Sequence, residues 1–273
     1  MNLLDLMSVE YRRSRRALYS SVALGAFLYL IALGDVVSKH QFSESLAILA
    51  FVLQSTGLVL RYRSTRRYES AEEIRRIAFL EDALGIAPSE LRKTEIASRV
   101  GGARAPERIF VGKYFASEAP QGVLRFLDDL SESAFWTCEV ARSAGRALLV
   151  LVLVGAMFSI FALLGLLNAG VAATNVKIGA EAFVVTLAFV VAGEMLLLSL
   201  DYFALAGKAS RILTSASSLL ESKGVDRDAT IILFGEYNCA LSATAPLPAF
   251  LYKLLQARLN AAWSARKAEL PVQ

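Results

Sequence analysis

The sequence predicts an all-α membrane protein, with four transmembrane helices in two hairpins, helical cytosolic extensions and a cytosolic C-terminal helical region. Of the 273 residues, 55% are hydrophobic, and the mean hydropathy is +0.48. An ordinary soluble domain is less apolar than this. Yet 20% of the residues are charged, so the polar residues must be separated from the apolar ones along the chain. That separation is typical of a membrane protein with substantial aqueous parts.

Four apolar runs are the predicted spans, because a bilayer core needs roughly 20 apolar residues in a helix. The second run is short, but it reaches spanning length if Ser43 and Glu44 begin its helix near the interface. The first run follows the basic string YRRSRR and is expected to be a retained anchor, since its core is long for a signal peptide and no small-residue cleavage site follows it. The four runs are residues 17–34, 46–60, 147–167 and 180–200.

Lysine and arginine are distributed unevenly among the segments outside these runs. Four precede the first run, fifteen lie in 61–146 and eight in 201–273, whereas the two short connections hold only Lys39 and Lys177. Because basic residues concentrate on the cytosolic side of a membrane, both termini and the long central segment are expected to be cytosolic. The predicted organisation is a cytosolic N-terminal helix (1–16), a first transmembrane hairpin (17–60), a cytosolic helical insert (61–146), a second transmembrane hairpin (147–200) and a cytosolic helical C-terminal region (201–273).

The cytosolic segments are predicted to be helical. Residues 61–86 lack glycine until Gly85 and carry opposite charges at helical spacing, such as Glu72 and Arg76, so they are expected to continue the second span. Apolar residues at helical spacing within 121–145 predict a helix that runs into the third span. Similarly, 202–222 are expected to continue the fourth span, and 226–243 to form a further helix.

The segment 248–268 predicts an amphipathic helix, with Pro248 in its first turn. The apolar stripe of this helix is expected to cover the cytosolic helical bundle, and the alternative is that it lies on the inner leaflet of the membrane. For Phe135 and Trp136, core or interface packing is the favoured interpretation and ligand stacking the alternative. The stripe consists of Leu251, Leu254, Leu255, Leu259 and Trp263.

The chain contains none of the phosphate-loop, nucleophile-elbow, kinase or zinc-protease motifs, so no enzymatic activity, cofactor or metal is expected. The single histidine, His40, is not enough for a zinc site. Residues 61–146 hold fifteen basic and thirteen acidic side chains, a near balance that argues against a nucleic-acid polymer as partner. The same balance does not exclude a small anionic ligand, because a pocket for one needs only two or three arginines and a stacking aromatic ring.

Two strings of the sequence carry a resemblance to a known family. They are KYFASEAPQGVLRFLDDLSESAFWTCEVA before the third span and FGEYNCALSATAPLPAFLYKLLQARLNAAW near the C-terminus. The most characteristic parts are ESAFW (132–136) and the stretch from Glu236 to Lys253. With two hydrophobic hairpins around a helical insert, the chain resembles the four-transmembrane effectors associated with SMODS nucleotidyltransferases in bacterial cyclic-oligonucleotide (CBASS) anti-phage systems.

This resemblance covers most of the chain and implies a pore-forming effector in the bacterial inner membrane. It implies a homo-oligomer that a cyclic oligonucleotide, made by a partner nucleotidyltransferase, activates from the cytosolic side. No ligand motif of the family can be transferred residue by residue. The candidates for a ligand site or a cytosolic interface are therefore polar and aromatic residues of the two strings: Tyr114, Arg125, Glu132, Trp136, Glu236, Tyr237 and Tyr252.

A layer of polar side chains is predicted within the spans, about 10 Å from the cytosolic boundary at about 1.5 Å per helical residue. Glu194 is its most informative member, because an ionised carboxylate inside a bilayer is costly. It either forms interhelical hydrogen bonds or lines a water-filled path, and four tightly packed helices would need to oligomerise to conduct. The candidate members are Glu194, Gln54, Thr56, Ser20, Ser21 and Asp201.

The function that the sequence favours is a membrane effector controlled from the cytosol. Two alternatives belong to other classes: a small transporter or ion channel, and a non-conducting membrane scaffold that docks a cytosolic partner. Only four spans, and no pair of helices interrupted by glycine or proline, argue against the transporter.

Overall fold

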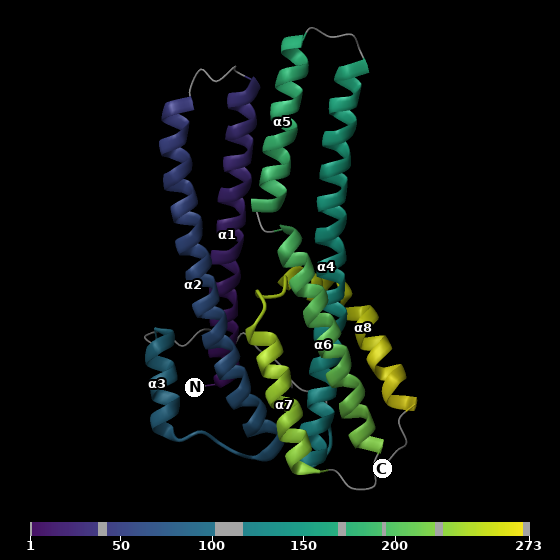
Figure 1. Ribbon diagram of the computed structural model, residues 1–273. Helices are drawn as coiled ribbons and strands as arrows, with labels where there is room; N and C mark the ends of the chain where they lie inside the picture. The colour runs from purple at the N-terminus through teal and green to yellow at the C-terminus, as the bar shows by residue number, and fades with distance from the viewer. Residues whose placement is uncertain are drawn as a thin grey trace. The chain divides into compact units, whose positions relative to one another are not determined.

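The computed structural model describes residues 2–37, 43–101, 117–168, 173–192, 195–221 and 226–269. Within these ranges all regular structure is helical, which confirms the predicted all-α class (Figure 1). The helices are α1 (Leu3–Val37), α2 (Ser43–Leu84), α3 (Glu90–Val100), α4 (Val123–Asn168), α5 (Ala173–Ala192), α6 (Met195–Glu221), α7 (Arg227–Ser242) and α8 (Ala249–Glu269).

Two of the described helices are long and apolar enough to cross a membrane. The most apolar 18-residue window of Leu3–Val36 in α1 has a mean hydropathy of 1.8, and that of Val123–Phe161 in α4 has 2.2. The run 46–60 lies within α2, and the run 180–200 is shared between α5 and α6. A total of four transmembrane helices, and the direction in which they cross, stay predictions.

The chain divides into two compact units. Unit 1 contains Met1–Arg15, Thr65–Ala144 and Asp201–Gln273, and unit 2 contains Arg16–Ser64 and Gly145–Leu200. Each of the helices α1, α2, α4 and α6 contributes residues to both units. The charged segments of the sequence therefore form one unit and the apolar runs form the other.

Unit 2 exposes large apolar side chains along its helices. Phe51 is 74% exposed, Phe161 64% and Leu30 63%, an arrangement that is unfavourable in water and typical of a helix surface that meets lipid or protein. Its helices are joined by polar contacts of small side chains. Ser21 Oγ donates to the carbonyl of Gly57 at 3.0 Å, and Ser199 Oγ to the carbonyl of Gly145 at 2.8 Å.

Unit 1 has an aromatic core where α2, α4 and α7 meet. The ring centroids of Phe79, Phe126 and Phe234 lie 5.0 Å apart in each pair, a spacing at which edge-to-face and tilted ring pairs are favourable. Leu127 and Leu130 of α4 are fully buried beside them. The helical periodicity predicted for 121–145 is confirmed, because this spacing places the apolar residues of α4 on one packed face.

The first residues of α1 form a second cluster in unit 1. Leu6 and Met7 are 2% exposed and pack with Ile74 of α2 and Ile96 of α3, which are fully buried. Beside this cluster the carboxylate of Glu10 accepts hydrogen bonds from Arg13 and Arg67. The cluster therefore fixes the first turns of α1 to unit 1.

Helix α8 agrees with the predicted helix in its position but only partly in its packing. Leu251, Leu259 and Trp263 are buried against unit 1 at 2–6% exposure, whereas Leu254 is 73% exposed. The prediction that Leu254 belongs to the packed stripe was wrong. Placing it on the stripe assumed a wide contact face, but the helix meets its neighbours over a narrower arc.

Candidate functional site

Arg75 of α2 is the centre of a buried polar cluster, which we call the Arg75 network. Its Nε donates to Oε2 of Glu72 at 2.7 Å, and its Nη2 donates to Oδ1 of Asn238 on α7 at 2.8 Å. The guanidinium also lies over the ring of Tyr237, 5.2 Å from its centroid. From α1, Tyr11 donates to Oε1 of Glu72 at 2.5 Å. The side chains of Glu72 and Arg75 are 5% and 6% exposed, so both charges are compensated inside the unit.

The predicted pairing of Glu72 with Arg76 was wrong. The carboxylate of Glu72 binds Arg75, while Arg76 Nε donates to the backbone carbonyl of Glu72 at 3.2 Å. Both spacings are allowed on a helix. Arg75 is selected because it is on the face that turns toward α7, where Asn238 accepts a further hydrogen bond from its guanidinium.

Tyr237 links the Arg75 network to α4. Its hydroxyl lies 2.8 Å from Oγ1 of Thr137 and donates to the carbonyl of Ser133 at 3.0 Å. The network therefore connects residues of α1, α2, α4 and α7. Burial is the first cause of a raised pKa for the nearby Tyr68, and the negative charge of Glu72 adds to it.

We expect Tyr237→Phe to lower the free energy of unfolding by about 1–3 kcal/mol, the usual cost of leaving a buried hydrogen-bonding group without its partner. The ring would keep its contact with Arg75, so packing is preserved and only the hydroxyl contacts to α4 are lost. Thermal unfolding of the purified protein in detergent measures the change. Tyr62→Phe is the control, because Tyr62 is 61% exposed. An equal loss for both variants would contradict this assignment.

The tryptophans of unit 1 pack against other aromatic rings. Trp136 is stacked with Tyr252, with centroids 6.5 Å apart and an interplanar angle of 19°. Phe135 lies 5.4 Å from Trp263 of α8. These contacts agree with the packing interpretation of Phe135 and Trp136, since both rings help to attach α8 to α4. Ligand stacking by Trp136 stays untested.

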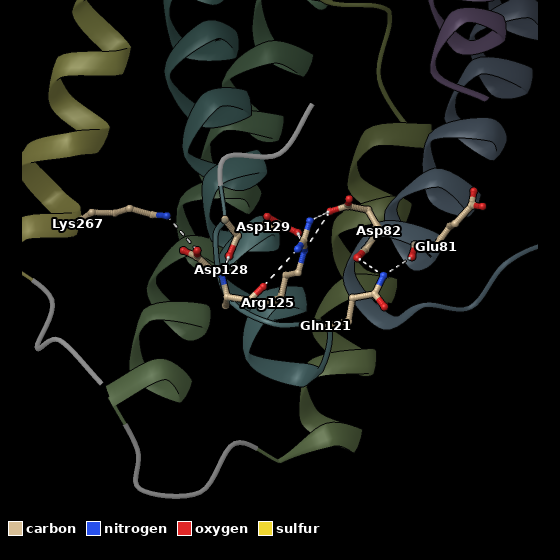
Figure 2. A network of polar contacts seen from close by, with 9 residues as sticks. Glu81, Asp82, Gln121, Arg125, Asp128, Asp129 and Lys267 are labelled. Atoms are coloured by element: carbon tan, nitrogen blue, oxygen red, sulfur yellow. Dashed lines mark hydrogen bonds and ion pairs between the residues drawn. The ribbon is translucent and has the colours of Figure 1, made fainter. Parts of the chain in front are cut away.

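A second polar cluster lies where the end of α2 meets the start of α4, and Figure 2 shows it from close by. Arg125 donates to Oδ2 of Asp82 through Nη2 at 2.7 Å and Nε at 3.2 Å. Gln121 donates to the carbonyl oxygens of Glu81 and Asp82 at 3.4 and 3.2 Å. Beyond α4, Lys267 of α8 binds Oδ2 of Asp128 at 2.9 Å.

Asp129 is the unusual member of this second cluster. Its side chain is fully buried, and neither carboxylate oxygen has a hydrogen-bond partner. Among the described residues, Arg125 approaches it with Nε at 3.9 Å, but Asp82 already binds that guanidinium. Burial, reinforced by the charge of Asp82, raises the pKa of Asp129 to about 7, and Arg125 only partly opposes the shift. A carboxyl group in such a place therefore keeps its proton at pH values where an exposed aspartate has already lost it.

An open groove of about 420 Å³ is lined by residues of α2, of the connection that follows it and by Arg92 of α3. Its lining includes the apolar Ile77, Leu80 and Pro88 and the cationic Arg76 and Arg92. Arg92 binds Glu73 and Glu95, so its charge is already compensated. None of the described residues that the sequence proposed for a ligand site line this groove.

The residues of the predicted polar layer do not form one described cluster. Ser21 bonds to Gly57, Ser20 and Gln54 are exposed, and Oγ1 of Thr56 bonds to the carbonyl of its own helix at Val52. Asp201 is exposed and is the first residue of a unit 1 segment. Glu194 lies outside the described residues. The shared depth of these side chains therefore stays a prediction.

The candidates for a ligand site or an interface lie in several places. Tyr237, Trp136 and Tyr252 lie in or beside the aromatic and polar core of unit 1, and Arg125 belongs to the second cluster. Glu132 is half-buried, and Glu236 is exposed. Tyr114 lies outside the described residues. The structure thus brings some candidates into two polar clusters but does not collect them around one pocket.

Sequence reasoning missed Arg75, Asn238 and Asp129. The sequence does place adjacent acids at Asp128 and Asp129, and the helical register of Leu127 and Leu130 could have suggested that one of them turns inward. For Arg75 and Asn238 there was no such signal, because their contact joins residues 163 positions apart. Within the described residues, no group of three or more metal-ligating side chains is present.

Comparisons of the chain with protein-family models, with curated proteins and with solved structures gave no match.

Proposed function

We propose that this protein is an integral membrane effector, in which the charged unit 1 lies in the cytosol and controls the permeability of a bilayer that contains unit 2. The observation that supports this most is the sharing of α1, α2, α4 and α6 between the two units. A continuous helix is stiff over several turns, so a rearrangement of unit 1 would move the apolar segments of the same helices. The resemblance to CBASS effectors adds a cyclic oligonucleotide as the activating ligand.

The Arg75 network is suited to hold a resting state. It attaches α1, α2 and α4 to one another and to α7 through buried, directional contacts. A ligand that binds unit 1 can shift its conformation only by as much as it prefers one arrangement of these contacts over another. Since a four-helix bundle is too tight to conduct, the proposed active state is a homo-oligomer in the bacterial inner membrane.

Release of a trapped dye from vesicles tests this function. The full chain is reconstituted into phospholipid vesicles, and release is followed with and without added cyclic oligonucleotides. The expected result is slow release that rises after addition of the activating nucleotide. Glu194→Gln is expected to reduce the release or change its ion preference, because an intramembrane carboxylate is costly unless it faces water or a partner.

Leu251→Asn is the control that shows how dye release changes when folding alone is impaired, because Leu251 is buried in unit 1. Constant release without any nucleotide would favour a channel. Binding of a soluble protein without release would favour the scaffold. Recovery of the full chain in the soluble fraction of cells would rule out the proposal as a whole.

A further inference from the structure

Helix α8 carries two apolar faces. One is buried in unit 1 and contains Leu251, Leu259 and Trp263. The other is open to solvent at its beginning, where Phe250 is 60% exposed and Leu254, one turn later, is 73% exposed. The buried face explains how α8 attaches to unit 1. It leaves the second face without a function in the fold.

The second face continues along the helix as small residues. With 3.6 residues per turn, exposed alanines follow Phe250 and Leu254 on the same side. Lys253 flanks this side on one edge and Arg258 on the other, and both are exposed. Nη2 of Arg258 also lies 3.9 Å from Oε2 of Glu139 on α4, but the Arg258 side chain is 63% exposed, so this pair leaves it accessible. We call the residues of this face the α8 strip: Phe250, Leu254, Ala257, Ala261 and Ala265.

The start of α8 is attached to the residues that directly follow the predicted fourth span. The hydroxyl of Tyr202 donates to the carbonyl of Pro246 at 3.0 Å, and both residues are buried. Tyr202 comes two residues after the apolar run 180–200, and Pro246 comes four residues before Phe250. This contact therefore holds the start of α8 beside the point where α6 leaves the predicted fourth span.

We propose that Phe250 and Leu254 insert into the headgroup region of the cytosolic leaflet, with Lys253 and Arg258 against anionic phospholipids. This inference rests on the proposed function, because it requires the run 180–200 to lie in the bilayer. Apolar side chains between flanking cations are the pattern by which helices bind an anionic lipid surface. The aliphatic part of the Arg258 side chain can cover apolar surface while the guanidinium stays in water.

A second copy of the chain is the competing occupant of the α8 strip. Two observations favour lipid. The bulky side chains are confined to the end of α8 next to Tyr202, whereas only alanines follow farther along. The cations on both edges would repel the same edges of an identical strip in a symmetric contact, but they complement phosphate groups.

Spin labels on the full chain test this contact. Leu254→Cys and Gln256→Cys are made in a Cys239→Ser background, because Cys239 is exposed while Cys138 is buried. Gln256 is exposed on the other side of the same turn of α8 and is the matched control. Leu151→Cys, on the exposed surface of unit 2, is the membrane reference. The proteins are reconstituted into vesicles of phosphatidylcholine and phosphatidylglycerol, and label collisions with oxygen and with a nickel chelate are measured.

The expected oxygen-to-nickel collision ratio at position 254 is several-fold higher than at 256, and it falls toward the value at 256 in vesicles of phosphatidylcholine alone. Equal, water-like ratios at 254 and 256, with a lipid-like ratio at 151, would overturn this inference and leave the proposed function intact. A water-like ratio at 151 would overturn both. Dipolar broadening between labels at 254 would show that a second copy occupies the strip, and it would likewise overturn the lipid contact.

Discussion

Arg75→Ala is expected to lower the free energy of unfolding by roughly 3–5 kcal/mol, the usual cost of removing one member of a buried ion pair. The variant would leave Glu72, 4% exposed, without its cation, and would remove the donor to Asn238. An uncompensated buried charge costs more than the pair contributes, so the loss exceeds that of one hydrogen bond. Unfolding by heat in detergent, followed by circular dichroism, measures the change.

Arg66→Ala is the control for the Arg75 variant. Arg66 lies on the same helix and pairs with Glu69 at 3.5 Å, but these side chains are 64% and 49% exposed. Solvent screens such a pair, so its loss is expected to cost less than about 1 kcal/mol. Similar losses for the two variants would show that the Arg75 network does not hold unit 1 together.

Asp129→Asn is expected to stabilise the protein above pH 7 and to remove part of its pH dependence. Asp129 is buried without a hydrogen-bond partner, and its pKa is raised from 3.8 to about 7. At higher pH the wild-type protein must keep an ionised carboxylate in this place, whereas asparagine stays neutral at every pH. A shift of about three pKa units sets an upper bound of about 4 kcal/mol on this effect.

The sign of the pH dependence follows from proton binding. Between about pH 4 and pH 7 the folded protein keeps the proton of Asp129, and the unfolded chain has lost it. The contribution of this group to stability is therefore complete below about pH 4, and it disappears as the pH rises through about 7. The charged groups that set this shift are Asp82, Arg125, Asp128 and Glu132.

Melting temperatures measured from pH 5 to pH 8 for the wild type and the variant provide the test. Asp128→Asn is the control, since Asp128 is adjacent in sequence but binds Lys267. The Asp128→Asn variant should lose stability toward pH 8 as the wild type does. A wild-type curve that rises over this range, or an Asp129→Asn curve parallel to it, would contradict the assignment.

The sequence was most informative where structure depends on neighbouring residues. The helices predicted over 226–243 and 248–268 are observed as α7 and α8 within one residue of those bounds, and the periodicity of 121–145 continues into the third apolar run as the single helix α4. Helical period, turn residues and apolar runs are local properties, so they can be predicted without knowledge of the packing. The prediction of cytosolic termini also rests on local composition, namely the distribution of lysine and arginine along the chain, and it stays a prediction.

The packing partners could not be predicted in this way. Glu72 has arginines both three and four residues later, and only the position of α7 selects Arg75. Leu254 fits a helical stripe as well as Leu251 does, but α8 meets unit 1 over too narrow an arc to bury both. Of two adjacent aspartates, one reaches Lys267 and the other is enclosed.

The sequence by itself determined the helical class, the separation of charged from apolar segments, and most helix positions, because these depend on composition and on short-range periodicity. Only the tertiary structure decided which charges become buried, which pairs compensate them, and which apolar face of α8 stays open. Those outcomes depend on contacts between residues such as Tyr202 and Pro246 or Arg75 and Asn238, which are far apart in the chain. No local pattern of the sequence predicts such contacts, because only the assembly of the helices brings these residues within hydrogen-bonding distance.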